Sequence, residues 1–269
     1  MHHPLLSGDT NIIPIVGHPI AQVKSPAGLS RLFSERGVNS LVIPADVSPD
    51  HLQTFLAAVS ITRNVPGLIA TVPHKRALAK FCDRLTERAR YAGSANVMFR
   101  SETGWVGDNT DGLGHCHGII AAGGTIRNKH VLLIGAGGAG SAMAYEFLNM
   151  GCLSLAIHDI EAVRRDHLIA RLDQKFPGRV HVGSTDAGGF DLVSNATPLG
   201  MSGQDDFPVN PDTLSTGQFV AEVVTKPVMT PLLKCALELG CDIMTGDQMF
   251  EAQSDILIQV LGGSLPEDS

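Results

Sequence analysis

Residues 130–140 read HVLLIGAGGAG, an apolar run that leads directly into a glycine-rich turn. Within the turn, Gly135, Gly137 and Gly140 form the pattern G-x-G-x-x-G, and a helix-compatible segment, 141–149, follows it. This order of strand, turn and helix is typical of dinucleotide sites, because side chains on the turn would keep the backbone away from a pyrophosphate at the helix N-terminus. The alternative is a glycine turn that only packs the helix against the strand. The context favours nucleotide contacts at Gly135, Ala136, Gly137, Gly138, Ala139 and Gly140.

The next apolar stretch, 153–158, ends at His158-Asp159. A carboxylate at the end of this strand can accept hydrogen bonds from the adenosine ribose and would repel a 2′-phosphate. We therefore expect Asp159 to lie at the cofactor, with NAD preferred over NADP, whereas His158 is expected at an ordinary strand position. Two alternatives stay open: Arg164 and Arg165 could reach a phosphate, and Asp159 could cap the following helix.

Strand-like and helical segments alternate along the whole chain, which predicts an α/β protein with parallel sheets covered on both faces. Strands are expected at 11–16, 40–44, 65–72, 130–134, 153–158, 180–182, 191–194, 219–224 and 242–244, with a hairpin formed by 97–100 and 105–106. Helices are expected from Ser25-Pro26 to Gly37, at 50–59, from Pro73 to about Leu85, after Asp111, and at 141–149 and 248–261.

Composition excludes several classes of protein. With 43% apolar and 17% charged residues, the chain can bury a large core and is not expected to be disordered. A net charge of −7 without a Lys/Arg-rich run argues against nucleic-acid or anionic-membrane partners. No apolar run approaches ~18 residues and no signal peptide is visible, so we expect a cytoplasmic protein. The five cysteines are scattered and the paired histidines at 115 and 117 do not share a helix face, so neither disulfides nor a metal site is expected.

Two charged residues are candidates for acid–base chemistry. In Thr71-Val-Pro-His-Lys75, Pro73 marks a helix start, so Lys75 falls in the first turn, where the helix dipole disfavours a cation and favours the neutral amine that proton transfer needs. A lysine that simply extends into water fits equally well. Asp111 lies in a turn-rich run, 107–112, where a helix N-cap is the competing interpretation. Nothing in their spacing brings the two together.

Polar amides interrupt two apolar patterns. Gln253 shares one face of the last helix with Met249, Ile256 and Val260, and Asn96 stands next to a strand. A buried amide needs a hydrogen-bond partner, and a ligand hydroxyl or a backbone group would serve for each.

Taken together, these segments resemble the shikimate/quinate dehydrogenase family over nearly the whole chain. The matching motifs are Gly17-His18-Pro19-Ile20 with Ser25-Pro26, Thr71–Lys75, Gly93–Asn96, Gly107–Gly112, Gly135–Gly140, Asn195–Met201, Thr230–Leu233, and Gly246–Met249 with Gln253. The resemblance implies a substrate-binding, catalytic domain of residues 1–110, joined by the C-terminal helix 247–269, and a doubly wound Rossmann-type domain of residues 111–246.

The resemblance also implies an activity. The family reversibly oxidises a ring hydroxyl of shikimate or quinate with a nicotinamide cofactor, in the chorismate pathway of aromatic amino acid biosynthesis. Lys75 would exchange the hydroxyl proton, and Asp111 would orient the hydroxyl and Lys75. Substrate contacts are implied at Val23, Ser25, Thr71, Asn96, Thr225 and Gln253, and cofactor contacts, besides the glycine turn, at His158, Asp159, Asn195, Ala196, Thr197, Pro198, Val223 and Gly246. The partner would be a small hydroxy acid, bound by a monomer or homodimer.

Three positions depart from the family pattern. Val23 stands where the family usually has Ser, and Ile69 stands where it usually has Asn or Ser. Thr225 stands where it usually has Tyr. A hydrogen bond to a charged group contributes ~1.5–3 kcal/mol, so one lost carboxylate contact weakens binding by ~10-fold or more. We therefore expect poor shikimate activity or a different cyclic, amino-substituted or smaller hydroxy substrate. The alternative from another class is an NAD-binding sensor or regulator with a vestigial substrate site.

Overall fold

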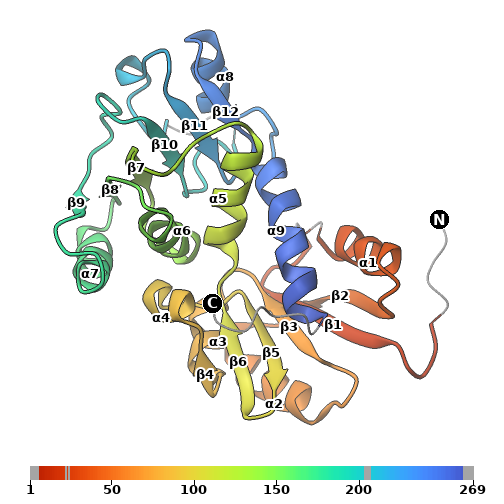
Figure 1. Cartoon of the computed structure of the whole chain (residues 1–269). Coiled ribbons are helices and arrows are strands. Elements are labelled where there is room, and N and C mark those ends of the chain that lie inside the picture. Colours follow the sequence, from red (N-terminus) through yellow and green to blue (C-terminus); the bar gives the residue numbers. More distant parts are fainter. Residues whose placement is uncertain (1–5, 22, 24, 203–206, 263–269) are drawn as a thin grey trace. The chain divides into compact units, whose positions relative to one another are not determined.

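The computed structural model describes residues 6–21, 23, 25–202 and 207–262, and the chain divides into two compact units (Figure 1). The first unit contains the residues up to Thr110 together with those from Ser254 onward, and the second contains Asp111–Gln253. The chain therefore leaves the first unit between Thr110 and Asp111 and returns to it within the last helix, α9 (Gly246–Leu261).

The first unit is built on a mixed six-stranded sheet with the order β2-β1-β3-β5-β6-β4. Its strands are β1 (Asn11–Gly17), β2 (Ser40–Asp46), β3 (Gly67–Ala70), β4 (Arg84–Leu85), β5 (Val97–Ser101) and β6 (Gly104–Asp108). β1 pairs in parallel with β2 and β3, whereas β5 runs antiparallel to β3 and forms the predicted hairpin with β6. The carboxyl ends of β1, β2 and β3 thus meet at one edge of the sheet.

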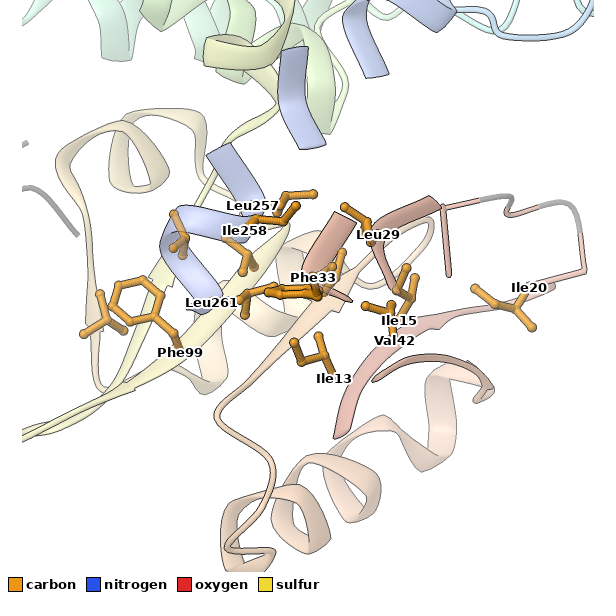
Figure 2. Close-up of a cluster of buried hydrophobic side chains, with 14 residues drawn as sticks. Ile13, Ile15, Ile20, Leu29, Phe33, Val42, Phe99, Leu257, Ile258 and Leu261 are labelled. Atoms are coloured by element: carbon orange, nitrogen blue, oxygen red, sulfur yellow. The ribbon is translucent and has the colours of Figure 1, made fainter. Parts of the chain in front are cut away.

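Both faces of this sheet are covered, because β1 alternates its apolar side chains between two cores. In the first core, Ile13 and Ile15 pack with α1 (Ser25–Glu35) and the end of α9. In the second core, Val16 packs with α2 (Leu52–Ile61) and α3 (Lys75–Phe81). The short helix η1 (Pro49–His51) precedes α2. Figure 2 shows the first core, where side chains of α9 gather with Phe33 of α1. The C-terminal helix is therefore part of the first unit's core.

The expected helix from Pro73 to Leu85 is wrong at its C-terminal end. α3 ends at Phe81, and β4 then pairs in parallel with β6 before α4 (Glu87–Ala92) begins. Thr86 caps α4 by accepting from the Ala89 N–H, and Gly93 ends it in the left-handed conformation. Strand pairing with β6, which periodicity cannot show, divides this segment in two.

The second unit has an all-parallel sheet with the order β12-β11-β10-β7-β8-β9. Its strands are β7 (His130–Ile134), β8 (Ser154–His158), β9 (Val180–Val182), β10 (Leu192–Asn195), β11 (Phe219–Glu222) and β12 (Asp242–Met244). This is the Rossmann strand order, in which the sequence of strands along the sheet reverses between the neighbouring parallel strands β7 and β10. The predicted doubly wound α/β fold is confirmed.

The helices of the second unit are α5 (Asp111–Ala121), α6 (Gly138–Asn149), α7 (Ala162–Asp173), α8 (Pro231–Glu238), the start of α9 and the short η2 (Pro211–Thr213). A core of buried side chains joins the central strands to α8 through Leu132, Val193, Val220 and Leu233. Among the described residues, no helix is long and apolar enough to cross a membrane, and no group of three or more His, Cys, Asp or Glu could hold a metal ion. The five cysteines are free thiols.

Candidate functional site

In the glycine turn between β7 and α6, the backbone conformation and the space for a side chain differ among the three glycines of the motif. Gly135 has φ +102°, which side chains rarely adopt, and a Cβ on Gly140 would lie 1.9 Å from the Gly135 carbonyl oxygen. A Cβ on Gly137 would meet nothing within 4 Å, so this position opens onto free space at the start of α6. The turn therefore presents backbone N–H groups at a helix N-terminus to an open surface, and its residues fit a bound pyrophosphate.

Asp159 lies against this turn. Asp159 is 8% exposed, and its carboxylate accepts from the Ala136 N–H at 2.7 Å and from the Glu161 N–H at 2.8 Å. Arg164 lies 3.6 Å from the Asp159 carboxylate and also pairs with Glu161, whereas Arg165 pairs with Asp166. Of the two basic residues, Arg164 is thus held between two carboxylates. Asp159 therefore links the glycine turn to Glu161, which is itself the N-cap of α7, so the expectation that Asp159 caps this helix is wrong. Its contact with the cofactor stays a prediction.

Asn195, at the end of β10, uses its side chain to shape the turn that follows. Its Oδ1 accepts from the Thr197 N–H and hydroxyl at 3.0 and 2.7 Å, and its Nδ2 donates to the Leu199 carbonyl and to Glu222. The buried Asn195 amide therefore sets the path of the turn, which leaves Pro198 at the surface.

Glu222, at the end of β11, is a buried site residue that sequence reasoning missed. It is 0% exposed, and burial raises its pKa to about 7, although its hydrogen bonds to Asn195, Val223, Val224 and Thr230 act in the opposite direction. The available signal was a carboxylate that interrupts the apolar run Phe219–Val224. Beyond it, Val223 and Thr225 are half-buried, and a Cβ on Gly246 would lie 2.4 Å from the Val224 carbonyl oxygen, so only glycine fits there.

Asp111 is the first residue of α5, and Gln253 is its partner. Asp111 is 4% exposed, and its carboxylate accepts from Gln253 Nε2 at 2.8 Å. A Cβ on Gly114, one turn along, would lie 2.5 Å from the Gln253 Cβ, so the two helices approach closely at this point. Gln253 has the hydrogen-bond partner that its position required, but this partner is a side-chain carboxylate and not the expected ligand hydroxyl or backbone group. The partner, Asp111, lies in the turn-rich run 107–112, and the spacing along the sequence could not show that Gln253 contacts this run.

His115 lies on the same face of α5 and is neutral. Its Nε2 is 2.7 Å from the Ser194 hydroxyl and its Nδ1 is 3.5 Å from Met249 Sδ. Complete burial lowers its pKa to about 3, because a charged imidazolium would be desolvated here. His115 therefore links α5 to β10, beside the Asn195 turn.

Lys75 is the first residue of α3 in the first unit, two residues after the Pro73 at which the helix was expected to open. Its backbone carbonyl accepts from the Ala95 N–H at 2.9 Å, and its side chain is partly exposed. The neighbouring Asn96 is buried: its Oδ1 accepts from the Thr110 N–H at 2.9 Å and its Nδ2 donates to the Thr110 hydroxyl at 3.0 Å. Asn96 thus fixes the residue immediately before Asp111. The pairing of Lys75 with Asp111 stays a prediction.

The other predicted substrate residues of the first unit differ in burial. Ser25 and Thr71 are half-buried, at the start of α1 and after β3. Val23 packs against the α1/α9 core, and Ile69 belongs to that core with 7% exposure. At Val23 and Ile69, the two departures from the family pattern in the first unit, an apolar side chain therefore contributes to packing.

A buried ion pair, also missed from the sequence, holds the end of β6. Asp108 is 0% exposed and accepts from Arg88 Nε and Nη2, both at 2.7 Å, as well as from the Thr86 hydroxyl. A bidentate contact of this kind fixes geometry strongly. It secures the strand from which the chain runs through Asn109 and Thr110 to Asp111.

A cavity of about 650 Å³ also lies in the first unit, outside these residues. Its lining includes His18, Asp46, Ser48, His51 and Phe55, with His18 Nδ1 2.8 Å from Asp46 Oδ1. Ser25, Thr71, Lys75 and Asn96 do not line it.

Comparison with known proteins gives consistent matches. Residues 15–98 match the family model described as the shikimate dehydrogenase substrate binding domain. A shikimate dehydrogenase (NADP(+)) of Lysinibacillus sphaericus is 31% identical over 255 residues, covering 94% of this chain and 92% of that protein.

Among solved structures, quinate dehydrogenase from Corynebacterium glutamicum in complex with NAD and the 5-ketofructose reductase of Gluconobacter sp. strain CHM43 are each 26% identical with a TM-score of 0.86. Each match covers 96% of this chain and 95% of the other.

Proposed function

Since the chain belongs to the shikimate/quinate dehydrogenase family and is thereby an NAD(P)-dependent oxidoreductase, we propose that Lys75 and Asp111 form its acid–base pair. The substrate would be shikimate, quinate or a related hydroxy compound, oxidised reversibly at a ring hydroxyl. The observation that carries this proposal is the buried Asp111 carboxylate, oriented by Gln253 at 2.8 Å. An oriented carboxylate at the start of a helix suits a group that positions a reacting hydroxyl.

In the proposed reaction, Lys75 takes the hydroxyl proton while the C–H electron pair leaves the carbon as hydride, so an alcohol becomes a ketone. Asp111 accepts the hydroxyl hydrogen bond and stabilises the ammonium that forms on Lys75. Gln253 holds the Asp111 carboxylate in position. The bound nicotinamide cofactor supplies the hydride acceptor. In the reverse direction Lys75 returns the proton to the carbonyl oxygen.

For the cofactor we propose that NAD is preferred over NADP. The Asp159 carboxylate, held beside the glycine turn by two backbone N–H groups, would repel a 2′-phosphate. Arg164, which could otherwise bind that phosphate, is paired with Asp159 and Glu161. These contacts support NAD, although the Lysinibacillus relative is named for NADP.

A second candidate is a hydroxy compound without a carboxylate. Val23 and Ile69 pack into an apolar core where the family usually has hydroxyl or amide groups, which removes hydrogen-bond donors for an anionic substrate. One structural relative is named as a 5-ketofructose reductase, and this name supports a substrate other than shikimate or quinate. A smaller or neutral polyol is therefore the alternative to shikimate and quinate.

The experiment is a substrate panel read by cofactor absorbance, with shikimate, quinate, an amino analogue of shikimate and neutral polyols, each with NAD and NADP. Lys75→Ala and Asp111→Asn are each expected to lower kcat by about 10²–10⁴-fold while the NAD Kd is retained, since general acid–base groups contribute on this scale. Lys80→Ala, an exposed lysine of the same helix α3, is the matched control and should keep wild-type turnover.

Wild-type turnover by either variant would refute its assigned role. NAD binding without turnover of any compound in the panel would instead favour the sensor or regulator, and would overturn the proposed activity.

A further inference from the structure

Glu222 occupies a defined place in the second unit. It ends β11, next to β10 and on the same side of the strand reversal. In the Rossmann arrangement each half of the sheet takes one mononucleotide at the carboxyl ends of its strands. With Asp159, directly after β8, assigned to the adenosine half as proposed above, the ends of β10 and β11 belong to the nicotinamide half.

The carboxylate of Glu222 is surrounded by neutral donors. Its Oε1 accepts from Asn195 Nδ2 at 2.8 Å, from the Val223 N–H at 2.9 Å and from the Val224 N–H at 3.2 Å. Its Oε2 accepts from the Thr230 hydroxyl at 3.3 Å. A hydroxyl can also accept, so a protonated Glu222 could donate to Thr230 through Oε2 and keep all three bonds at Oε1. Both protonation states can therefore be satisfied in one geometry.

Titration near neutral pH is consistent with this arrangement, because burial raises the pKa of Glu222 to about 7. His115, linked to the neighbouring Ser194, stays neutral in that range, since its pKa is lowered to about 3. The other titratable groups on the surrounding elements are Asp191, Cys235, Cys241, Lys226, Lys234, Glu238, Asp242 and Asp247. Glu222 is thus a completely buried carboxyl at the nicotinamide half.

We infer that Glu222 is a buried counter-charge for the oxidised nicotinamide ring, so that the protein distinguishes NAD⁺ from NADH by the ionisation of this carboxyl. The inference rests on the proposed binding of a nicotinamide cofactor to the second unit. The oxidised ring carries one positive charge and the reduced ring carries none, whereas the phosphates are the same in both. An ionised Glu222 therefore stabilises bound NAD⁺ selectively, and binding of NAD⁺ releases the Glu222 proton to solvent.

The test measures the Kd of NAD⁺ and of NADH from about pH 5.5 to about pH 8.5 by titration calorimetry, with no turnover involved. NAD⁺ should bind more tightly as pH rises through about 7, and the Kd ratio of NADH to NAD⁺ should rise about tenfold. A tenfold change corresponds to about 1.4 kcal/mol of selective stabilisation of bound NAD⁺ by the ionised carboxyl. Calorimetry in buffers of different ionisation enthalpy should show proton release with NAD⁺ near pH 7 and less with NADH.

Glu222→Gln is the decisive variant, because its amide oxygen can keep the three bonds at Oε1 and its amide nitrogen can donate to Thr230. The rise in the Kd ratio should disappear in Glu222→Gln and persist in Glu238→Gln, which removes an exposed carboxylate from α8. If Glu222→Gln does not fold, ¹³C NMR of the wild-type carboxyl replaces it, with a lower Glu222 pKa expected in the NAD⁺ complex than in the NADH complex.

A Kd ratio independent of pH, a rise that persists in Glu222→Gln, or equal carboxyl pKa values in the two complexes would overturn the counter-charge while leaving the proposed function intact. Absence of binding of both nucleotides would overturn both.

Discussion

We expect the substitution Gly137→Ala in the glycine turn to weaken nucleotide binding while leaving the stability of the fold nearly unchanged. Gly137 is the N-cap of α6 with φ −70° and ψ −166°, an extended conformation that alanine adopts, and a Cβ there would meet nothing within 4 Å. The substitution therefore introduces neither strain nor a clash within the protein. It places a methyl group in the space that a pyrophosphate would occupy in front of the α6 backbone N–H groups.

The two expected magnitudes differ widely. For stability, alanine is a poorer N-cap than glycine, but it reduces the freedom of the unfolded chain by ~0.4–1 kcal/mol, so the unfolding free energy should change by less than about 1 kcal/mol. For binding, loss of one hydrogen bond to a charged phosphate costs ~1.5–3 kcal/mol, which weakens the NAD Kd by about 10- to 100-fold.

Gly8→Ala is the matched control. Gly8 also has open space where a Cβ would lie and does not have a positive φ, but it is far from the turn in sequence, in the first unit. Both variants should unfold in urea as the wild type does, and only Gly137→Ala should lose NAD affinity in titration calorimetry. An unchanged NAD Kd in Gly137→Ala, or an equal loss in Gly8→Ala, would refute the assignment of this turn to the pyrophosphate.

Three further predictions follow from the geometry. Asp159→Ser should reduce the NAD-to-NADP ratio of kcat/KM by about tenfold or more, because a ribose acceptor and a repulsive charge are both lost; a constant ratio would contradict the role. Arg88→Met should lower the unfolding free energy by about 3–5 kcal/mol, because it leaves a buried carboxylate unpaired, whereas the exposed Arg90→Met should change it by less than about 0.5 kcal/mol. The buried groups His115 and Glu222 should have opposite effects on stability. The folded pKa of His115, about 3, lies below its ordinary value, so its contribution is lost as pH falls below about 6.5, whereas the folded pKa of Glu222, about 7, lies above its ordinary value, so acidification towards about 4.5 stabilises the fold. In Glu222→Gln only the first effect remains, and urea unfolding from about pH 7 to about pH 5 should show a loss of about 2 kcal/mol more than in the wild type.

Local patterns were sufficient for much of this protein. The run from His130 to Gly140 predicts a strand, a turn and a helix from apolar content and glycine spacing alone, and the structure has β7 and α6 there. Such patterns work because neighbours along the chain decide backbone conformation in a buried strand or a glycine turn. The segment 73–85 was harder, because its division into α3 and β4 depends on pairing with β6, which is distant in sequence.

The roles of the polar residues depended on contacts that sequence distance hides. Gln253 was predicted to need a partner, but only the packing of α9 against α5 makes that partner Asp111. Glu222 looks like an ordinary charge at a strand end until the ends of β10 and α8 bring Asn195 and Thr230 to it. The sequence thus determined which polar side chains are available and which of them lie on predicted strands, turns or helices. The tertiary structure decided which of them are removed from water together, and this desolvation is the main cause of the shifted pKa values of Glu222 and His115.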